Sequence, residues 1–379
     1  MSENKLQTLR KLGQSVWYDY IRRDIYTTGK LAQLIRDDGL AGMTSNPTIF
    51  QKAIAETDLY DEDIRRFAEA GDATPRIFER LAVEDVRSAA DVFRPVHDQS
   101  GGDDGFVSIE VGPQLAHDTA ATIAEARRLW QECDRKNVMV KIPGTAEGVP
   151  AIRACLAEGI NINITLLFSV ARYREVMEAF LSAMEERVRS GKPVEKIRSV
   201  ASFFVSRVDT NADKKLDAIA KDPAAPEARK RRARELRGKL AIGNARLAYQ
   251  AFEEVFGASR FTALKGKGVR VQRPLWASTS TKDPAYPELY YVEALIAPET
   301  VDTMPPETFD AYRSKGDPRV RIGEDLDGAR AAFDGLAEIG IDSKQIFREL
   351  EDEGLQKFSD SYDKLVAAVE EKEKAVRVS

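Results

Sequence analysis

Eight short apolar or alternating segments, separated by stretches of helical periodicity, restrict the fold of this 379-residue sequence more than any other feature. Clear helical stretches are Thr119–Arg135 and Ser169–Val188. Strands and helices that alternate about eight times predict an α/β fold, a (β/α)8 TIM barrel with additional helices. The alternative, an open doubly wound sheet, lacks the G-x-G-x-x-G motif that would follow its first strand. The predicted strands are Ser15–Tyr20, Gly42–Asn46, Gly105–Val111, Val138–Ile142, Asn161–Phe168, Val200–Val208, Val269–Ser278 and Val301–Met304.

Three segments extend the predicted barrel, which we expect to form a single domain over residues 1–379. Residues 213–267 are long for one crossover and predict a helical insertion. Arg94–Gly105 has the composition of an exposed loop. Residues 355–375 predict a C-terminal helix that packs across the barrel, because apolar residues recur every three or four positions. They are Leu355, Phe358, Tyr362, Leu365 and Val369.

The charge balance disfavours two classes of partner. The net charge of −5 and a pI near 5.5 favour neither nucleic acid nor an anionic membrane surface. The basic run Arg229–Arg232 lies in a helical, Glu-containing stretch and is interpreted as a solvated helix face. No apolar run approaches the roughly 20 residues of a membrane span, and the first residues lack the apolar region of a signal peptide.

Cysteine and histidine are scarce. Cys133 and Cys155 both lie in helical sequence, which predicts packing residues in a reducing cytoplasm and no disulfide framework. His97 and His117 are the only histidines, and neither has a partner at metal-ligand spacing. We therefore expect no metal, and chemistry without a histidine base. The oligomeric state stays open, with a homodimer as one alternative.

Polar residues share one parity on several predicted strands, although a strand buried on both faces should be apolar throughout. Ser108 and Glu110 share one face of their strand, with valines and an isoleucine on the other. Asn163 and Thr165 alternate in the same way with Ile162, Ile164 and Leu166. Most of these residues lie toward the carboxyl ends of the strands, where barrel enzymes place their sites. Further polar residues that fit the pattern are Asp19, Thr44, Asn46 and Lys141.

The lysine in this set suggests a reaction class. A lysine amine held away from water has a lowered pKa, so part of it is neutral and attacks a carbonyl. The resulting iminium accepts electrons when a neighbouring C–C bond breaks. Apolar residues flank Lys141 on both sides, which makes a solvent-directed lysine the weaker interpretation. Asp19 and Glu110 are the available acid/base groups, and the amides of Asn46 and Asn163 suit sugar hydroxyls.

Two strand ends carry groups that suit a phosphate. Arg207 follows the sixth strand, and its planar guanidinium can bind two phosphate oxygens at once. A surface ion pair with Asp209 or Asp213 is an equally good interpretation of Arg207 alone. Ser278–Lys282 follows the seventh strand with hydroxyls and a cation. Each signal is weak by itself.

The motifs that contain these residues resemble those of the transaldolase family, and they occur in the family's order from Ser15 to about Met304. TSNPTIF (Thr44–Phe50) is similar to the family's early asparagine motif, and VKIPGT (Val140–Thr145) to the motif of its Schiff-base lysine. GININITLLFS (Gly159–Ser169) is similar to its fifth-strand motif, and SFFVSRVD (Ser202–Asp209) to its phosphate-side serine, phenylalanine and arginine.

The resemblance implies a role for each candidate residue. Lys141 forms the Schiff base, and Asp19 is the acid/base of carbon–carbon cleavage. Glu110 and Thr165 hold a catalytic water. The remaining residues bind substrate: Asn46 and Asn163 orient the dihydroxyacetone part, Ser202 and Phe204 line that end, and Arg207 and Ser278 bind the phosphate.

The implied reaction belongs to the non-oxidative pentose phosphate pathway and requires no cofactor. A dihydroxyacetone unit passes reversibly from sedoheptulose 7-phosphate or fructose 6-phosphate to glyceraldehyde 3-phosphate or erythrose 4-phosphate. One departure concerns the phosphate, because many members carry an arginine where this chain has Ser280. Lys282 is the candidate replacement. The insertion and the PETVDTMP stretch are similar to the longer bacterial subgroup, which is also found fused to a phosphoglucose isomerase.

Two other functions compete with this interpretation. A related Schiff-base aldolase of the fructose-6-phosphate type would release free dihydroxyacetone. Such enzymes are shorter and typically carry glutamine in place of Glu110 and tyrosine in place of Phe204. A catalytically inactive barrel that senses sugar phosphates is the second alternative, and the complete set of catalytic residues argues against it.

Overall fold

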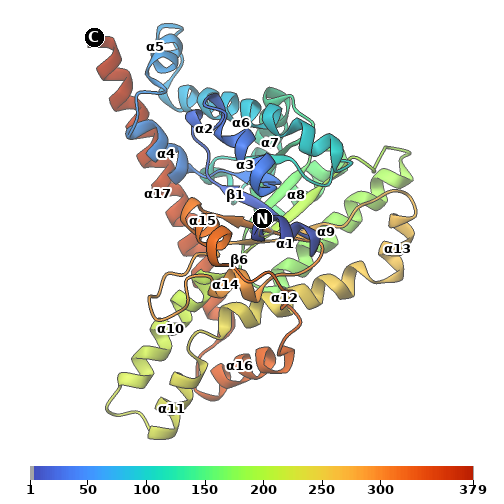
Figure 1. Cartoon of the computed structure of the whole chain (residues 1–379), viewed down its shortest axis with the longest axis vertical. Helices are drawn as coiled ribbons and strands as arrows, with labels where there is room; N and C mark the ends of the chain where they lie inside the picture. Colours follow the sequence, from blue (N-terminus) through green and yellow to red (C-terminus); the bar gives the residue numbers. More distant parts are fainter. Residues whose placement is uncertain (1–3, 379) are drawn as a thin grey trace.

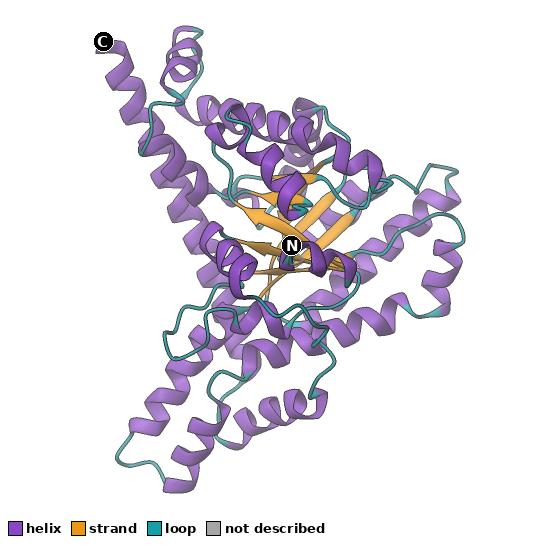
Figure 2. Ribbon diagram, in the orientation of Figure 1, coloured by secondary structure: helices purple, strands orange, loops and turns teal. Residues whose placement is uncertain are grey.

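The computed structural model describes residues 4–378, and its eight strands form one closed parallel barrel in sequential order. All eight predicted strands are present, and the predicted TIM barrel is confirmed. Figure 2 shows the strands at the centre of the molecule with helices around them. The strands are β1 (Gln14–Asp19), β2 (Gly42–Thr44), β3 (Phe106–Glu110), β4 (Val138–Pro143), β5 (Ile162–Leu167), β6 (Ser199–Phe204), β7 (Arg273–Ala277) and β8 (Thr300–Met304).

Apolar side chains of one parity fill the lower part of the barrel. Trp17, Phe106, Met139 and Val301 belong to this inner cluster and are almost completely buried. The indole of Trp17 lies against Gly42, where a Cβ atom would stand only 2.5 Å from the ring. A glycine is therefore required at this position of β2. Polar groups lie on both sides of this cluster: Ser15, Asp104 and Arg273 bond to one another at the amino ends of the strands, and a second polar set lies toward the carboxyl ends.

The helices surround the barrel and extend beyond it (Figure 1). The predicted helices 119–135 and 169–188 correspond to α7 and α9. In chain order the helices are α1 (Lys5–Lys11), α2 (Arg23–Thr27), α3 (Lys30–Asp38), α4 (Pro47–Ala55), α5 (Asp61–Glu69), α6 (Thr74–Gln99), the 3-10 helix η1 (Pro113–Leu115), α7 (Thr119–Cys133), α8 (Gly148–Glu158), α9 (Val170–Arg189), α10 (Ser206–Lys221), α11 (Glu227–Leu236), α12 (Leu240–Phe256), α13 (Ser259–Lys265), α14 (Tyr290–Ala294), α15 (Pro306–Lys315), α16 (Leu326–Glu338) and α17 (Ser343–Val378).

The sixth strand ends earlier than the sequence pattern predicts. β6 stops at Phe204 and α10 begins at Ser206, so the prediction of a strand through Val208 is wrong. The apolar residues Val205 and Val208 continue the strand pattern, but in the structure they lie three positions apart on the buried side of a helix start. Arg207 therefore stands in the first turn of a helix. Residues 213–267 are largely helical, in α10 to α13, and their assignment as an insertion stays a prediction.

The prediction of an exposed loop over Arg94–Gly105 is wrong for the first half of this segment. The helix α6 continues through Pro95 to Gln99. His97 is buried in this helix, with its ring centroid 5.1 Å from that of Phe106, and burial lowers the pKa of His97 to about 4. Packing of this apolar side against β3 outweighs the missing N–H of the proline. Only the turn after residue 99 remains outside the helix.

The C-terminal helix α17 is longer than predicted, because it begins at Ser343 instead of near residue 355. Phe358, Leu365 and Val369 are buried, as the helical period indicated. The helix packs on α4 and α5 and runs past the edge of the barrel, where Figure 1 shows it in red. The distant end of the chain thereby reaches the rim at which the strands end.

The basic run lies on helix α11, as predicted. Arg229 donates hydrogen bonds to the backbone carbonyl of Ile339, and Arg232 pairs with Glu338 at the end of α16. These contacts hold the two helices together. The run therefore contributes to helix packing at the surface.

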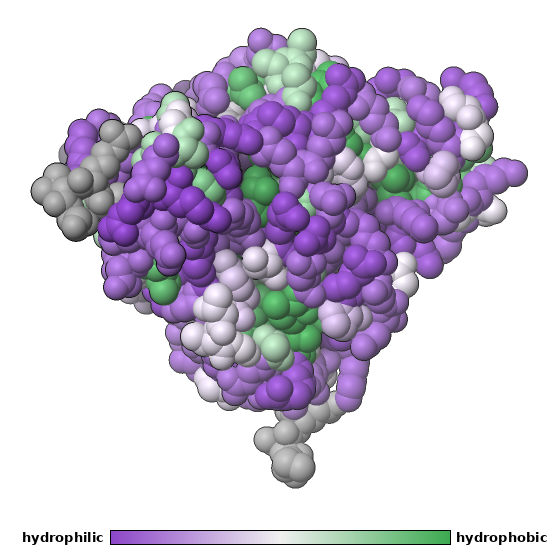
Figure 3. Space-filling model, turned by 90° about the horizontal axis from the view of Figure 1, so that it is seen from above, coloured by the Kyte–Doolittle hydropathy of each residue, from purple (hydrophilic) through white to green (hydrophobic). Residues whose placement is uncertain are grey.

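The face of the molecule in Figure 3 is largely hydrophilic, with apolar residues in small separate patches. No helix within residues 4–378 is long and apolar enough to cross a membrane.

Cys133 and Cys155 are free and buried, and burial raises the pKa of both thiols to about 12, as expected for packing residues. The assignment of residues 1–379 to one domain stays a prediction.

Candidate active site

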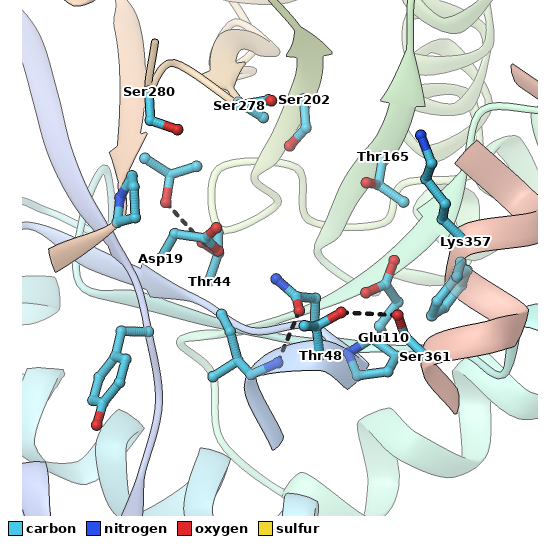
Figure 4. Close-up of a pocket in the computed structure, with 18 of the residues that line it drawn as sticks. Asp19, Thr44, Thr48, Glu110, Thr165, Ser202, Ser278, Ser280, Lys357 and Ser361 are labelled. Carbon is cyan, nitrogen blue, oxygen red and sulfur yellow. Dashed lines mark hydrogen bonds between the residues drawn. The ribbon is translucent and has the colours of Figure 1, made fainter. Parts of the chain in front are cut away.

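A cavity of about 550 Å³ opens at the carboxyl ends of the strands. Its volume lies within the range of roughly 300–1,000 Å³ that small-molecule sites occupy. Figure 4 shows side chains from several strands and from α17 around it. Ten of the eleven predicted site residues line the cavity: Asp19, Asn46, Glu110, Lys141, Thr165, Ser202, Phe204, Arg207, Ser278 and Lys282.

Lys141 points into the barrel, as the strand parity predicted. It lies on β4 directly beside Glu110 of β3 in the strand register. Its ammonium donates to Glu110 Oε2 at 3.2 Å and to the backbone carbonyl of Ser45 at 3.1 Å. Only 7% of the residue is exposed. The amine is therefore shielded from bulk water and has one carboxylate within reach.

Two carboxyl groups line the same cavity as this amine, Glu110 from the neighbouring strand β3 and Asp19 from β1. Burial raises the pKa of Glu110, and the charge of Lys141 opposes this shift. Burial also raises the pKa of Asp19, against a hydrogen bond of 2.7 Å from the Thr44 hydroxyl and the charge of Lys141. Thr44 in turn lies 2.7 Å from the hydroxyl of Thr303. The site thus holds two carboxyls whose protonated forms are favoured by burial, and both can exchange protons with a substrate.

Asn163 lies below the cavity and does not line it. It is completely buried on β5, where its amide donates to Ser108 Oγ at 3.0 Å and accepts from Ser202 Oγ at 2.7 Å. This chain of hydrogen bonds joins three strands and fixes the orientation of Ser202. Thr165, the next inward residue of β5, does reach the cavity.

The fifth strand departs from regular alternation just above Asn163. A register shift separates Ile164 from Leu167, and Leu166 adopts a positive φ of 59°. Such a bulge re-aims side chains near the end of a strand. Leu166 therefore lines the cavity, whereas simple parity predicts that it faces the helices with the isoleucines.

Asn46 combines a structural contact with a place at the cavity. Its side-chain oxygen accepts a hydrogen bond of 3.1 Å from the backbone N–H of Ile49, which caps the N-terminus of α4. Pro47 occupies the first helical position, where its missing N–H is not needed. The motif TSNPTIF is therefore a helix-capping sequence as well as a source of a site residue.

Arg207 contributes a guanidinium to the cavity wall. It stacks over the ring of Phe204, with 4.9 Å between the guanidinium carbon and the ring centroid. No hydrogen bond or ion pair joins its guanidinium to another residue of the described chain. Burial lowers the pKa of Arg207, but arginine remains charged. A half-buried cation of this kind favours binding of an anion from the cavity.

Hydroxyl groups lie on the same side as Arg207. Ser278 adopts a positive φ of 56°, and its Oγ lies 2.9 Å from Ser206 Oγ at the start of α10. Non-glycine residues in this backbone region are uncommon and cluster at functional sites. The exposed Lys282 donates to Ser280 Oγ at 2.6 Å. These hydroxyl and ammonium groups can all donate hydrogen bonds to phosphate oxygens.

Sequence reasoning missed several residues that line the cavity. Thr303 has the same strand parity as the inward Val301, so alternation could have indicated it. Lys357 and Ser361 come from α17, and no strand pattern could have found them. The described lining residues include six cationic and four acidic side chains, in a chain whose net charge is −5. The cations are Arg22, Lys52, Lys141, Arg207, Lys282 and Lys357.

Comparison with known proteins places the chain in a family. Residues 16–369 match the family Transaldolase/Fructose-6-phosphate aldolase. A transaldolase of Thermobifida fusca is 48% identical over 96% of this chain and 97% of that protein. A transaldolase of Saccharopolyspora erythraea is 46% identical over 98% of both chains, and one of Mycobacterium bovis is 48% identical over 95% of both. With its barrel and its inward lysine, the chain belongs to the transaldolase/fructose-6-phosphate aldolase family.

Proposed function

We propose that this chain is a transaldolase that acts through a Schiff base on Lys141. A dihydroxyacetone unit passes reversibly from sedoheptulose 7-phosphate or fructose 6-phosphate to glyceraldehyde 3-phosphate or erythrose 4-phosphate. The observation that carries the proposal is the Lys141 amine, which lies inside the barrel and 3.2 Å from Glu110. The similarity of the whole chain to proteins named transaldolase supports the same activity.

The first steps form the Schiff base. Transfer of one proton from the Lys141 ammonium to the Glu110 carboxylate frees the amine, which attacks the C2 carbonyl of the ketose. The carbinolamine then loses its hydroxyl as water, with the proton supplied by Glu110, and leaves an iminium. Thr165 supplies a hydroxyl on the same wall that holds this water in place.

Cleavage of the C3–C4 bond follows. Asp19 removes the proton of the C4 hydroxyl, and the electron pair of the C3–C4 bond moves into the iminium. The aldose phosphate leaves, and a dihydroxyacetone enamine remains on Lys141. The reverse of these steps joins the enamine to the aldehyde carbon of the acceptor. Hydrolysis then releases the new ketose phosphate and restores the amine.

The cavity walls suit the two ends of the substrate. Asn46 and Ser202 face the dihydroxyacetone part, with Asn163 holding Ser202 from below. Phe204 lines the same end and supports the guanidinium of Arg207. We assign the phosphate to Arg207, Ser278 and Lys282, because the unpaired guanidinium can form two charge-assisted hydrogen bonds to it.

Product analysis tests the proposal against the aldolase alternative. The purified chain is incubated with fructose 6-phosphate, with and without erythrose 4-phosphate. We expect the ketose to be consumed beyond a single turnover only with the acceptor, and sedoheptulose 7-phosphate to form. Steady release of free dihydroxyacetone without acceptor would favour the aldolase. No consumption under either condition would favour the inactive sensor.

Acid pH should slow the reaction through Asp19. Because burial raises the pKa of Asp19 and the proposed base must be ionised, we expect kcat/KM to fall through a pKa above the ordinary value of about 3.9. A raised pKa in the folded state means that protonation of Asp19 favours folding, and this stabilisation disappears as pH rises through that pKa. Activity lost in acid is therefore not explained by the effect of Asp19 on stability. A pH profile of kcat/KM, with circular dichroism at each pH, checks this. An acid limb at or below pH 4 contradicts it.

Location and assembly are part of the same proposal. The two free, buried thiols fit a reducing compartment, and we assign the chain to the cytoplasm. A homodimer is one assembly compatible with this function. Light scattering on the purified chain measures the oligomeric state directly.

A further inference from the structure

The C-terminal helix α17 forms one wall of the cavity, although it is far from the strands in the sequence. Gly354, Lys357, Phe358 and Ser361 all line the cavity, and they fall on one side of the helix at spacings of three or four. Lys357 extends from α17 toward the part of the cavity lined by Thr165 (Figure 4). This lysine is the one cation that α17 contributes among the described lining residues.

Two contacts hold this part of α17 against the barrel. Gly354 lies where a Cβ atom would stand 3.2 Å from Leu166 Cδ2, tighter than ordinary van der Waals contact, so its lack of a side chain permits the close approach. One helical turn beyond Lys357, Ser361 accepts a hydrogen bond of 2.9 Å from the Thr48 hydroxyl of α4. The backbone at Lys357 is thus fixed on both sides, and its long side chain is free to reach.

A second cavity of about 440 Å³ adjoins the first, and Arg207 and Lys357 line both. Glu353 lines the second cavity with these two cations. Its carboxylate accepts from Lys357 at 3.3 Å, and its charge opposes the effect of burial on the pKa of Arg207. The exposed Glu353 carboxylate therefore pairs with Lys357 and acts on Arg207 only through its charge. A substrate phosphate, with two negative charges, is a stronger partner for both.

We propose that Lys357 binds the phosphate of the sugar substrates together with Arg207, so that α17 supplies a cation at the rim of the barrel. The inference rests on the proposed function and adds to it a residue that no strand motif contains. When phosphate binds, Lys357 turns from Glu353 to the phosphate oxygens.

The alternative is that Lys357 only stabilises its own helix. Glu353 and Lys357 stand four residues apart in the favourable order, and the Lys357 side chain is 62% exposed. Exposed pairs of this kind contribute little to stability. A purely helical role therefore predicts a small change in unfolding temperature and no change in substrate affinity.

Steady-state kinetics of Lys357→Gln separate the two roles. We expect KM for fructose 6-phosphate to rise about tenfold, as for the loss of one charge-assisted hydrogen bond, with kcat within about threefold. Inorganic phosphate should inhibit competitively, and its inhibition constant should rise by a similar factor. Lys364→Gln removes an exposed lysine of α17 outside the cavity and is the matched control. Lys357→Arg keeps the charge and should hold KM within about threefold of the parent.

Three results distinguish failure of this inference from failure of the proposed function. If the parent chain is active and Lys357→Gln keeps the parental KM and phosphate inhibition, Lys357 does not bind phosphate. If Lys364→Gln changes KM as much as Lys357→Gln does, the effect belongs to the helix and the inference is also wrong. If the parent itself does not consume fructose 6-phosphate with acceptor present, the transaldolase proposal fails.

Discussion

Lys141→Ala is expected to lower kcat for dihydroxyacetone transfer on the order of 10⁴-fold or more, because it removes the proposed nucleophile of a covalent mechanism. The fold should persist. Glu110 loses its ion pair, but burial already favours its protonated form, so the carboxyl can remain in place without a charge. Steady-state transfer from fructose 6-phosphate to erythrose 4-phosphate, with circular dichroism of the same sample, measures both effects.

Lys136→Ala is the matched control for this change. Lys136 precedes the same strand at its opposite end, and it pairs at the surface with Asp98. Exposed ion pairs contribute at most about 1 kcal/mol, so this variant should keep the activity of the parent. Activity of a folded Lys141→Ala variant near that of the control would refute the assignment of the nucleophile.

Asp19→Asn should lower kcat by about 10²–10⁴-fold, the usual contribution of a positioned general base. Asparagine has nearly the same shape, and its oxygen can still accept the hydrogen bond from Thr44. The variant should therefore fold and still form the Schiff base, but it should cleave the C3–C4 bond slowly. Single-turnover release of the aldose phosphate measures the affected step.

The control for Asp19→Asn is Glu307→Gln, which removes an exposed acid from the wall of the same cavity. Its kcat should stay within about threefold of the parent, because an exposed charge is strongly screened. Equal losses in both variants would mean that Asp19 acts only through the overall charge of the cavity. Parental kcat in Asp19→Asn would remove it from the proposed mechanism.

Most of the site could be predicted from the alternation of polar and apolar residues along the strands. It placed Lys141 and Glu110 inside the barrel, and the register sets them side by side on β4 and β3. The same alternation placed Asp19 and Thr165 at the cavity. This succeeds because side chains of a barrel strand have only two directions, so one parity of polar residues identifies the inner face.

The alternation of polar and apolar residues does not show how deep in the barrel a side chain lies, or where a strand is irregular. Asn163 has the correct parity, yet it lies one layer below the cavity and holds Ser202. Leu166 has the wrong parity, but the bulge in β5 turns it toward the cavity. Arg207 was predicted near the end of a strand but lies on a helix. Over so short a stretch, the apolar residues around it fit the strand period and the helix period equally. Such details depend on backbone geometry, which the order of residue types does not encode directly.

Tertiary packing decides the remaining features. α6 continues through Pro95 because its buried face, including His97, lies against β3. The amphipathic pattern after Gly354 predicted a helix across the barrel. It did not predict which polar residue of that helix would face the cavity, since this depends on the contact of Gly354 with Leu166. Lys357 therefore emerged only from the structure.

Borohydride trapping shows whether the sugar binds covalently to Lys141. The chain is incubated with fructose 6-phosphate and borohydride, digested, and analysed by mass spectrometry. We expect one peptide to gain the mass of a reduced three-carbon unit, fragmentation to place this mass on Lys141, and Lys141→Ala to show no such peptide. An active chain with no added mass on the peptide that contains Lys141, or with the added mass on another lysine, would contradict this expectation.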